Sequence, residues 1–170
     1  MRRAPLLLLL ALTPACASSG AVPAPFPTVG PPTAAPIVAT AEPTDAEVKE
    51  RPAVVGTALS LQGAPYRDGG ADPSGFDCSG FVSYVFAQQG IYVPRTVSEQ
   101  YAQGQPISKD AAAPGDLVFF STVAPGASHV GIVVSAEEFV HAPSSRGLVR
   151  LESLKAPYWS SRLVGTRRVR

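Results

Sequence analysis

The chain has 170 residues, of which 45% are hydrophobic and 16% are charged, and its formal net charge is +1. This length can bury one modest core, so we expect one folded domain. The 14 basic and 13 acidic residues nearly cancel, which excludes the concentrated positive charge of a nucleic-acid-binding protein. The short basic run at the C-terminus, with Arg167, Arg168 and Arg170, is typical of a solvated strand end.

The first sixteen residues have the pattern of an export signal. Two arginines follow Met1, an apolar run covers residues 6–12, and small residues come next. The apolar run is much shorter than the ~20 residues that a bilayer span requires. Residues 1–16 are therefore interpreted as a signal peptide and not as a membrane helix.

Two processing sites compete at the end of this signal. Residues 12–16, with the sequence LTPAC, resemble the lipobox of bacterial lipoproteins, although Thr13 stands where that pattern has an aliphatic residue. In this case Cys16 becomes lipidated and anchors the protein to a membrane. Alternatively, Ala15-Cys16-Ala17 is a cleavage site, and the product is a soluble periplasmic or secreted protein. We favour the lipoprotein of the cell envelope.

Residues 17–43 are rich in proline, alanine, threonine and valine. Seven prolines lie between Pro23 and Pro43, and charged residues are nearly absent. Such a composition gives an extended chain without a core. We interpret this segment as a disordered tether, followed by a folded domain over residues 44–170.

The first helix of the domain is expected after Thr44, which begins a sequence with capping-box spacing. Pro52 is compatible only with a break or with a second helix start. We therefore predict a helix over 52–62 that ends at Gly63.

Two further helices have clear start and stop signals. Apolar residues recur at helical spacing over 78–89, and Asp77 stands at the N-cap position. A helix over 96–103 is predicted from Thr96, which begins a second capping box, and from Gly104, which follows the last turn.

After residue 114 the pattern changes to short strands that are rich in valine and phenylalanine. Helices first and strands second, with short links, predict an α+β fold in which the helices pack on a small antiparallel sheet. We expect about five strands, over residues 117–121, 129–135, 138–141, 147–151 and 163–169.

Cys78 is the one thiol that remains in the exported protein, because Cys16 is either lipidated or removed. An inert buried cysteine is common, but two features favour a nucleophile. A helix start and a nearby histidine both lower the pKa of a thiol, and the thiolate is the reactive form. The predicted helix begins at Cys78, which meets the first condition.

The chain has two histidines, His129 and His141. They lie on successive predicted strands joined by a tight turn at residues 135–136. Because strand side chains alternate between faces, the two imidazoles can lie on one face of this hairpin. Together with Cys78 they could also bind zinc, but a structural zinc site needs four ligands. We expect no metal and no cofactor.

Three motifs resemble those of the NlpC/P60 family of cell-wall cysteine peptidases. FDCSGFV at 76–82 resembles its nucleophile motif, SHVGI at 128–132 its histidine motif, and FVHA at 139–142 the segment with its third catalytic residue. The resemblance covers roughly residues 54–169 and implies a papain-like α+β fold. Lesser similarities are PY at 65–66, PRT at 94–96 with Gln100, and PGDLVFF at 114–120.

The resemblance implies a role for each catalytic residue. Cys78 would attack an amide carbonyl, and His129 would hold the thiolate as an ion pair and later protonate the leaving amine. His141 would orient His129. The substrate implied is a peptidoglycan stem peptide cut next to D-glutamate, between it and diaminopimelate.

Four residues near the nucleophile are implied in substrate binding: Tyr66, Asp77, Ser79 and Arg95. Arg95 could pair with a substrate carboxylate or form a structural salt bridge, and the sequence leaves both roles open. We expect a monomer. Two alternative functions also stay open at this stage: a non-catalytic binding lipoprotein of the envelope, and a thiol-dependent amidase or acyltransferase.

Overall fold

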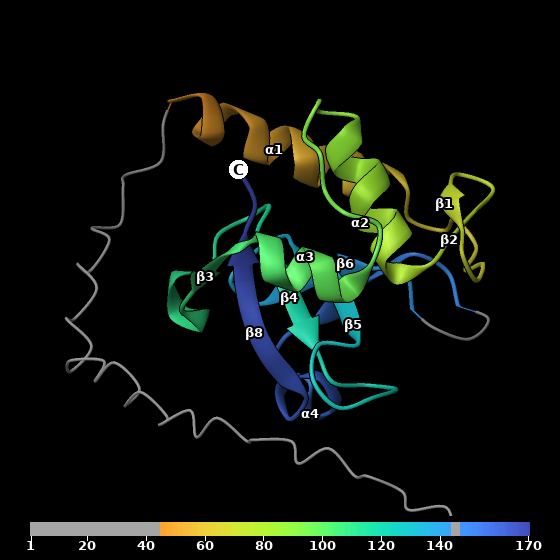
Figure 1. Ribbon diagram of the computed structural model, residues 1–170, viewed down its shortest axis with the longest axis vertical. Helices are drawn as coiled ribbons and strands as arrows, with labels where there is room; N and C mark the ends of the chain where they lie inside the picture. The colour runs from red at the N-terminus through yellow and green to blue at the C-terminus, as the bar shows by residue number, and fades with distance from the viewer. Residues whose placement is uncertain (1–44, 144–146) are drawn as a thin grey trace, which may run out of the picture. The chain divides into compact units, whose positions relative to one another are not determined.

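The computed structural model describes residues 45–143 and 147–170 (Figure 1). The predicted signal peptide, the lipidation site Cys16 and the tether over 17–43 lie outside the described residues, as does Thr44. No helix within the described ranges combines the length and the apolar character needed to cross a membrane.

The domain consists of helices followed by an antiparallel sheet, which confirms the predicted α+β fold. The helices are α1 (Asp45–Ser60), α2 (Cys78–Ala87), α3 (Val97–Gln103), a 3₁₀ turn η1 (Lys109–Ala111) and the short α4 (Pro157–Ser160). The strands of the main sheet are β3 (Gln105–Ile107), β4 (Leu117–Phe120), β5 (His129–Val133), β6 (Glu138–His141), β7 (Arg150–Ser153) and β8 (Leu163–Arg168).

The described sheet has six strands, one more than predicted, in the order β3-β8-β4-β5-β6-β7, and every pairing in it is antiparallel. The additional strand, β3, is three residues long and contains a proline, so it carries no alternating pattern. A separate two-residue hairpin, β1 (Ala71–Asp72) with β2 (Gly75–Phe76), precedes α2. Segments this short give no periodicity that a sequence pattern could detect.

The prediction of a break at Pro52 was wrong. Helix α1 runs from Asp45 to Ser60 with Pro52 inside it. An interior proline costs about 3 kcal/mol, but the turns that follow it bury Val54 and Ala58 in the core against α2 and the sheet. Tertiary packing of this face offsets the lost backbone hydrogen bond.

The strand predicted over 147–151 begins three residues later and ends two residues later in the structure, as β7. Arg150, and not Gly147, begins the strand, because Arg150 is the residue opposite His141 of β6. The preceding residues pair elsewhere: Val149 N–H donates to the Ala64 carbonyl at 2.8 Å, and Tyr66 N–H donates to the Gly147 carbonyl at 2.8 Å. The first half of the predicted strand therefore pairs with the backbone of residues 63–66 and not with β6.

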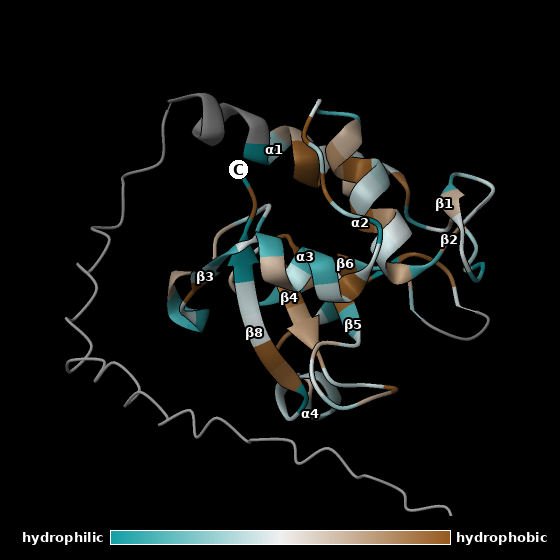
Figure 2. Ribbon diagram, in the orientation of Figure 1, coloured by the Kyte–Doolittle hydropathy of each residue, from teal (hydrophilic) through white to brown (hydrophobic). Residues whose placement is uncertain are grey.

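Both faces of β4 are buried, which explains its unbroken apolar sequence LVFF. Leu117 and Phe119 face the core shared with α1 and α2, whereas Val118 and Phe120 belong to a second cluster with Trp159. Figure 2 shows the apolar character of α2 and β4. The first cluster fixes α2 against the sheet, where α2 contacts β5 and β6.

Asp116, at the entry to β4, is the buried centre of an ion network that the sequence did not predict. Its side chain is 1% exposed. Arg51 Nη1 donates to its Oδ1 at 3.1 Å, and Arg168 donates through Nε at 2.9 Å and through Nη2 at 2.8 Å. The Ala113 N–H also donates to Oδ2 at 2.8 Å. The network joins α1, the entry to β4 and the last strand.

We expect Asp116→Asn to lower the free energy of unfolding by about 3 kcal/mol, because it removes the negative centre of a buried network. Urea denaturation followed by circular dichroism measures this change. Asp110→Asn, an exposed carboxylate of η1, is the matched control and should change the stability little. Equal stability of the two variants would contradict the role given to Asp116.

Candidate active site

Asp77 fixes the start of α2, as predicted. Its side chain accepts a hydrogen bond from the Gly80 N–H at 2.7 Å, so Asp77 is the N-cap and Cys78 is the first helical residue. Gly80 is required by close approach: a Cβ there would lie 2.0 Å from the Gly70 carbonyl oxygen. The first turn of α2 therefore sits directly against the loop that precedes β1.

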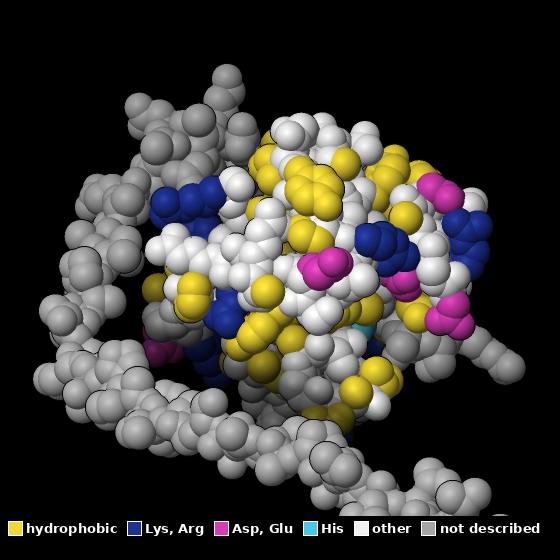
Figure 3. Space-filling model, viewed as in Figure 1, with side chains coloured by type: hydrophobic (Ala, Val, Ile, Leu, Met, Phe, Trp, Pro, Cys, Tyr) yellow, Lys and Arg dark blue, Asp and Glu magenta, His cyan; other side chains and the backbone are white. Residues whose placement is uncertain are grey.

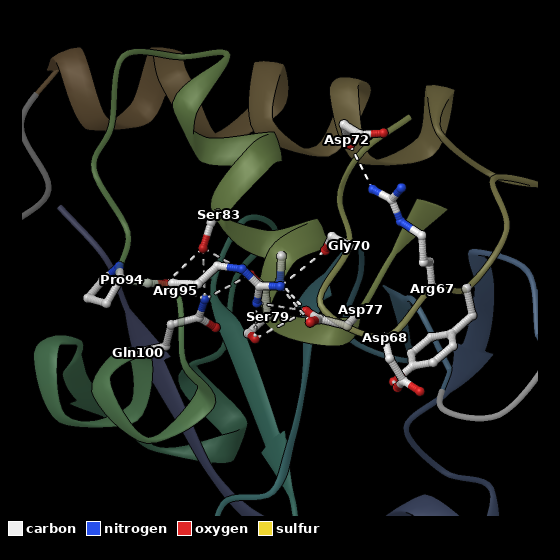
Figure 4. Close-up of polar contacts among 12 residues, drawn as sticks. Arg67, Asp68, Gly70, Asp72, Asp77, Ser79, Ser83, Pro94, Arg95 and Gln100 are labelled. Atoms are coloured by element: carbon white, nitrogen blue, oxygen red, sulfur yellow. Dashed lines mark hydrogen bonds and ion pairs between the residues drawn. The ribbon is translucent and has the colours of Figure 1, made fainter. Parts of the chain in front are cut away.

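Arg95 pairs with Asp77, so the salt bridge, one of the two roles that the sequence left open, is present. Its Nη1 donates to Asp77 Oδ1 at 2.9 Å and its Nη2 to Oδ2 at 2.5 Å. The guanidinium also donates to Ser79 Oγ at 2.9 Å and to the Gly70 carbonyl at 3.3 Å (Figure 4). Arg95 thus holds both residues that flank Cys78.

Gln100 supports the same turn from below, a role the sequence did not reveal beyond a family similarity. The side chain is fully buried. Its Nε2 donates to the Pro94 carbonyl at 2.7 Å and to the Ser79 carbonyl at 3.0 Å (Figure 4). It therefore ties α3 to the segment that carries Arg95 and to the first turn of α2.

The two histidines are in direct contact, as the hairpin predicted. His129 Nε2 lies 2.7 Å from His141 Nδ1, and the ring planes are at 89°. Gly131 of β5 makes room for this contact with β6. A Cβ on Gly131 would lie 2.5 Å from the Phe139 ring and 3.2 Å from His141 Cβ. The bond occupies Nε2 of His129 and leaves Nδ1 as the ring nitrogen that can face a thiol.

Trp159 covers the histidine pair from α4. Its ring stacks on His129 with centroids 5.6 Å apart and planes at 23°, and it meets His141 edge-on at 5.0 Å. This role was missed from the sequence, where α4 gave no signal. His129 is 3% exposed and His141 is fully buried, so little histidine surface appears on the face drawn in Figure 3.

The thiol of Cys78 lies against the beginning of β5. The backbone N–H groups of Ser79 and Val130 act on it and favour the thiolate. Because Val130 directly follows His129, this contact brings the nucleophile candidate to the strand end where the histidine stands. The start of α2 and the start of β5 therefore lie together at the candidate site.

Burial nevertheless raises the pKa of Cys78, and the negative charge of Asp77 raises it further. Burial also lowers the pKa of His129 from 6.5 to about 4. Burial, followed by the neighbouring His129 and Arg150, lowers the pKa of His141. The sequence predicts a lowered thiol pKa, but desolvation outweighs the helix start here. These shifts favour a neutral thiol and a neutral imidazole pair in the site.

Tyr66 lies close enough to the thiol for the charges of Cys78 and Asp77 to act on it. Its Oη donates to Asp68 Oδ1 at 2.8 Å. Burial and the Asp68 hydrogen bond raise the pKa of Tyr66 to about 12. The phenol therefore stays protonated, with its hydroxyl held over the nucleophile side of the site.

Within residues 45–143 and 147–170, no group of three or more histidine, cysteine, aspartate or glutamate side chains is arranged to hold a metal ion. The facing nitrogens of His129 and His141 are bonded to each other. The chemistry that the arrangement can perform is nucleophilic attack by a thiol assisted by a base.

A thiol at a helix start, beside a buried histidine pair on an antiparallel sheet, is the arrangement of a thiol-dependent hydrolase. The sequence model described as "NlpC/P60 family" matches residues 63–168. The chain therefore belongs to the NlpC/P60 family.

Relatives of known name share this part of the chain. It is 43% identical over 116 residues to "Probable endopeptidase p60" of Listeria seeligeri, covering 68% of this chain and 22% of that protein. It is 41% identical over 109 residues to "Murein DD-endopeptidase MepS/Murein LD-carboxypeptidase" of Escherichia coli K12, covering 64% and 57%. It is 33% identical over 138 residues to "Gamma-DL-glutamyl hydrolase" of Bacillus subtilis, covering 79% and 33%.

Solved structures share the fold. An NLP/P60-family protein of Staphylococcus aureus, described as similar to lipoprotein, superposes with a TM-score of 0.67 at 33% identity, over 77% of this chain and 45% of that one. The NlpC/p60 domain of the peptidoglycan hydrolase SagA superposes with a TM-score of 0.62 at 34% identity, over 70% and 98%. The papain-like NlpC/P60 fold expected from the motifs is thus confirmed.

The depressed histidine pKa values predict that acid destabilises the protein. Below pH 6.5 an unfolded histidine binds a proton, whereas the folded His129 stays neutral down to about pH 4. The unfolded state then holds more protons, so stability is present above pH 6.5 and is lost as the pH falls toward 4, by up to about 1.4 kcal/mol per pH unit for each histidine.

Urea denaturation between pH 4.5 and 7.5 measures this slope. We expect His141→Gln to flatten it, since one of the two titrating groups is removed. Carboxylates act in a lower window: Asp77, whose pKa is lowered from 3.8, loses its contribution only below that pH. A wild-type stability that does not change between pH 6.5 and 4.5 would show that the histidines are not held neutral.

Proposed function

We propose that this protein is a cysteine endopeptidase that hydrolyses peptidoglycan stem peptides next to D-glutamate, at a D-glutamyl–diaminopimelate type bond. Cys78 is the nucleophile, His129 the base, and His141 the group that orients His129. One observation carries the proposal: His129 Nε2 is bonded to His141 Nδ1 at 2.7 Å. This bond leaves His129 Nδ1 for the thiol of Cys78, which lies against the start of the strand that carries His129.

In the first step the Cys78 thiol gives its proton to His129 while sulfur attacks the amide carbonyl carbon. A C–S bond forms and the carbonyl oxygen becomes an oxyanion. The N–H groups of Gly80 and Phe81 are bonded to Asp77, so the helix-start amides of Cys78 and Ser79 are the donors proposed for this charge.

In the second step the C–N bond breaks and protonated His129 gives its proton to the leaving amine. The acyl group remains on sulfur as a thioester. Water, deprotonated by His129, then attacks the thioester carbon, the C–S bond breaks, and the thiol is restored with the proton from His129. His141 holds the imidazole in one orientation through Nδ1 throughout.

Substrate recognition on the acyl side is proposed for Tyr66, Asp77, Ser79 and Arg95. All four lie around the nucleophile. Because Arg95 and Asp77 are bonded to each other, we propose that they present a fixed dipolar surface. Ser79 Oγ accepts from Arg95 and donates to Asp77 at 3.3 Å, and we propose that it turns this weakly bound proton toward a substrate carboxylate. Tyr66 presents its ring to the same space.

The relatives support this substrate by their names. The chain spans about a fifth of the Listeria p60 relative and 57% of the E. coli relative, so the activity of the whole protein is part of the proposal. The names of the p60, MepS and gamma-glutamyl hydrolase relatives indicate peptide-bond hydrolysis, murein and a glutamyl bond. The glutamyl hydrolase name supports a stem peptide cut beside D-glutamate, whereas the MepS name specifies DD-endopeptidase and LD-carboxypeptidase activity on murein.

We also propose that the protein acts in the bacterial cell envelope as a monomer. The predicted signal over 1–16 would export it, and Cys16 would carry the lipid that anchors it. The proline- and alanine-rich residues 17–43 would let the catalytic domain, residues 44–170, reach the wall from a membrane.

Digestion of purified peptidoglycan tests the nucleophile. We expect wild-type protein to release fragments with new stem-peptide ends, detected by mass spectrometry, and Cys78→Ala to release none, because no thioester can form. Gln88→Ala, at the exposed C-terminal end of α2, is the control for a small change in this helix. Equal cleavage by Cys78→Ala would refute the mechanism, and transfer of the acyl group to an added amine would favour the acyltransferase.

The two histidines should differ in their effects on kcat. His129→Ala is expected to abolish activity nearly as fully as loss of the thiol, since His129 is the base proposed to take the thiol proton. His141→Ala should lower kcat by about 10²–10³-fold and leave a measurable rate, because an orienting group contributes less than the base itself. Steady-state kinetics on a stem tetrapeptide separates these outcomes, and identical residual rates for both variants would contradict the assignment.

A further inference from the structure

A cavity of about 390 Å³ lies beside the histidine pair, on the side formed by β7 and α4. None of the residues proposed above for substrate binding lines it. Its wall combines aromatic rings, an ion pair and a hydroxyl, from the side chains of Thr122, His129, Arg150, Glu152, Tyr158 and Trp159.

The reaction itself determines which part of the substrate meets this wall. His129 gives a proton to the leaving amine, so the fragment that carries this amine begins within hydrogen-bond reach of His129. His129 is also part of the cavity wall. The side chain of the residue that provides the leaving amine can therefore extend into the cavity.

The cavity contains a complementary pair of charges. Arg150 and Glu152 are alternate residues of β7 and so project from the same face. Arg150 Nε donates to Glu152 Oε1 at 2.8 Å, and the two side chains are 53% and 27% exposed. This contact leaves Nη1 and Nη2 of Arg150 without a hydrogen-bond partner in the described part of the chain.

Two further observations point to a ligand at this place. Thr122 lines the cavity, and its buried Oγ1 has no hydrogen-bond partner among residues 45–143 and 147–170; a small shift of this side chain would let a ligand satisfy it. Tyr158 and Trp159 also line the cavity and provide apolar surface, and Tyr158 is half exposed. The cavity thus offers aromatic surface for methylene groups and the charged side chains of Arg150 and Glu152.

We propose that this β7 cavity binds the leaving-group side of the substrate, and that Arg150 and Glu152 select a side chain that ends in a carboxylate and an ammonium on one carbon. Arg150 would bind the carboxylate through its two terminal nitrogens, and Glu152 would accept from the ammonium. Two strand spacings, about 10 Å, separate β5 from β7, so the ligand side chain must be long. Diaminopimelate has this side chain, whereas lysine ends in the ammonium alone.

The inference rests on the proposed function but is tested without catalysis. Isothermal titration calorimetry on the Cys78→Ala protein compares two dipeptides, meso-diaminopimelyl-D-alanine and L-lysyl-D-alanine. We expect the first to bind about tenfold more tightly. Adding Arg150→Gln should remove this preference, whereas Glu152→Gln should weaken both dipeptides, since both carry the ammonium. Lys155→Gln, which breaks the exposed ion pair with Glu137, is the matched control and should change neither affinity.

Equal affinity for the two dipeptides, no binding of either, or an equal loss for both in Arg150→Gln would overturn the inference. Arg150→Lys, which keeps the charge but not the two-nitrogen fork, should recover only part of the preference. Hydrolysis of L-alanyl-γ-D-glutamyl-meso-diaminopimelyl-D-alanine by the wild-type protein is measured in parallel. Selective dipeptide binding without hydrolysis would overturn the proposed function but support the binding site in the cavity. Hydrolysis without selective dipeptide binding would support the proposed function but overturn this binding site.

Discussion

The carboxylate of Asp77 is the group on which the geometry of the site depends. It caps α2 through the Gly80 N–H, pairs with Arg95 through both oxygens, and accepts a weaker bond from Ser79 Oγ at 3.3 Å. One side chain thereby fixes where the helix begins, which residue is first in it, and which loop packs on it. Gln100 secures the same turn through the carbonyl of Ser79.

The same carboxylate has an electrostatic cost. Its charge adds to burial in raising the pKa of Cys78, so the group that positions the thiol also opposes its ionisation. Arg95 offsets part of this cost with a positive charge at hydrogen-bond distance from Asp77. An uncapped helix start would favour the thiolate but leave its backbone donors unpaired. The observed helix start therefore fixes the position of Cys78 and leaves its thiol harder to ionise.

Much of the site was predictable because its determinants are local in sequence. Asp77 before Cys78, and Thr96 at the start of α3, are helix caps, and the predicted caps are present. The contact between His129 and His141 followed from strand alternation and a short hairpin. Gly131 is part of the same local pattern, since the close approach that it permits is to the neighbouring strand of that hairpin.

The rest depended on contacts between distant segments. α1 continues through Pro52 because residues beyond it are buried, and β7 begins late because the residues before Arg150 pair with 63–66. Asp116 is sequentially distant from Arg51 and Arg168, so the network around it had no pattern to reveal it. Trp159 reaches the histidines from a four-residue helix. No periodic signal encodes such a contact.

These long-range contacts also connect the cavity to the chemistry. His141 is fully buried, its Nε2 has no hydrogen-bond partner among the described residues, and the positive charge of Arg150 lowers its pKa after the effects of burial and His129. In the proposed role, a histidine in this position would orient His129 without placing a second negative charge in the buried site. A ligand carboxylate on Arg150 would offset the positive field at His141 and so make the histidine pair easier to protonate. Because proton transfer from Cys78 to His129 requires such protonation, filling the cavity would favour the first step of the reaction.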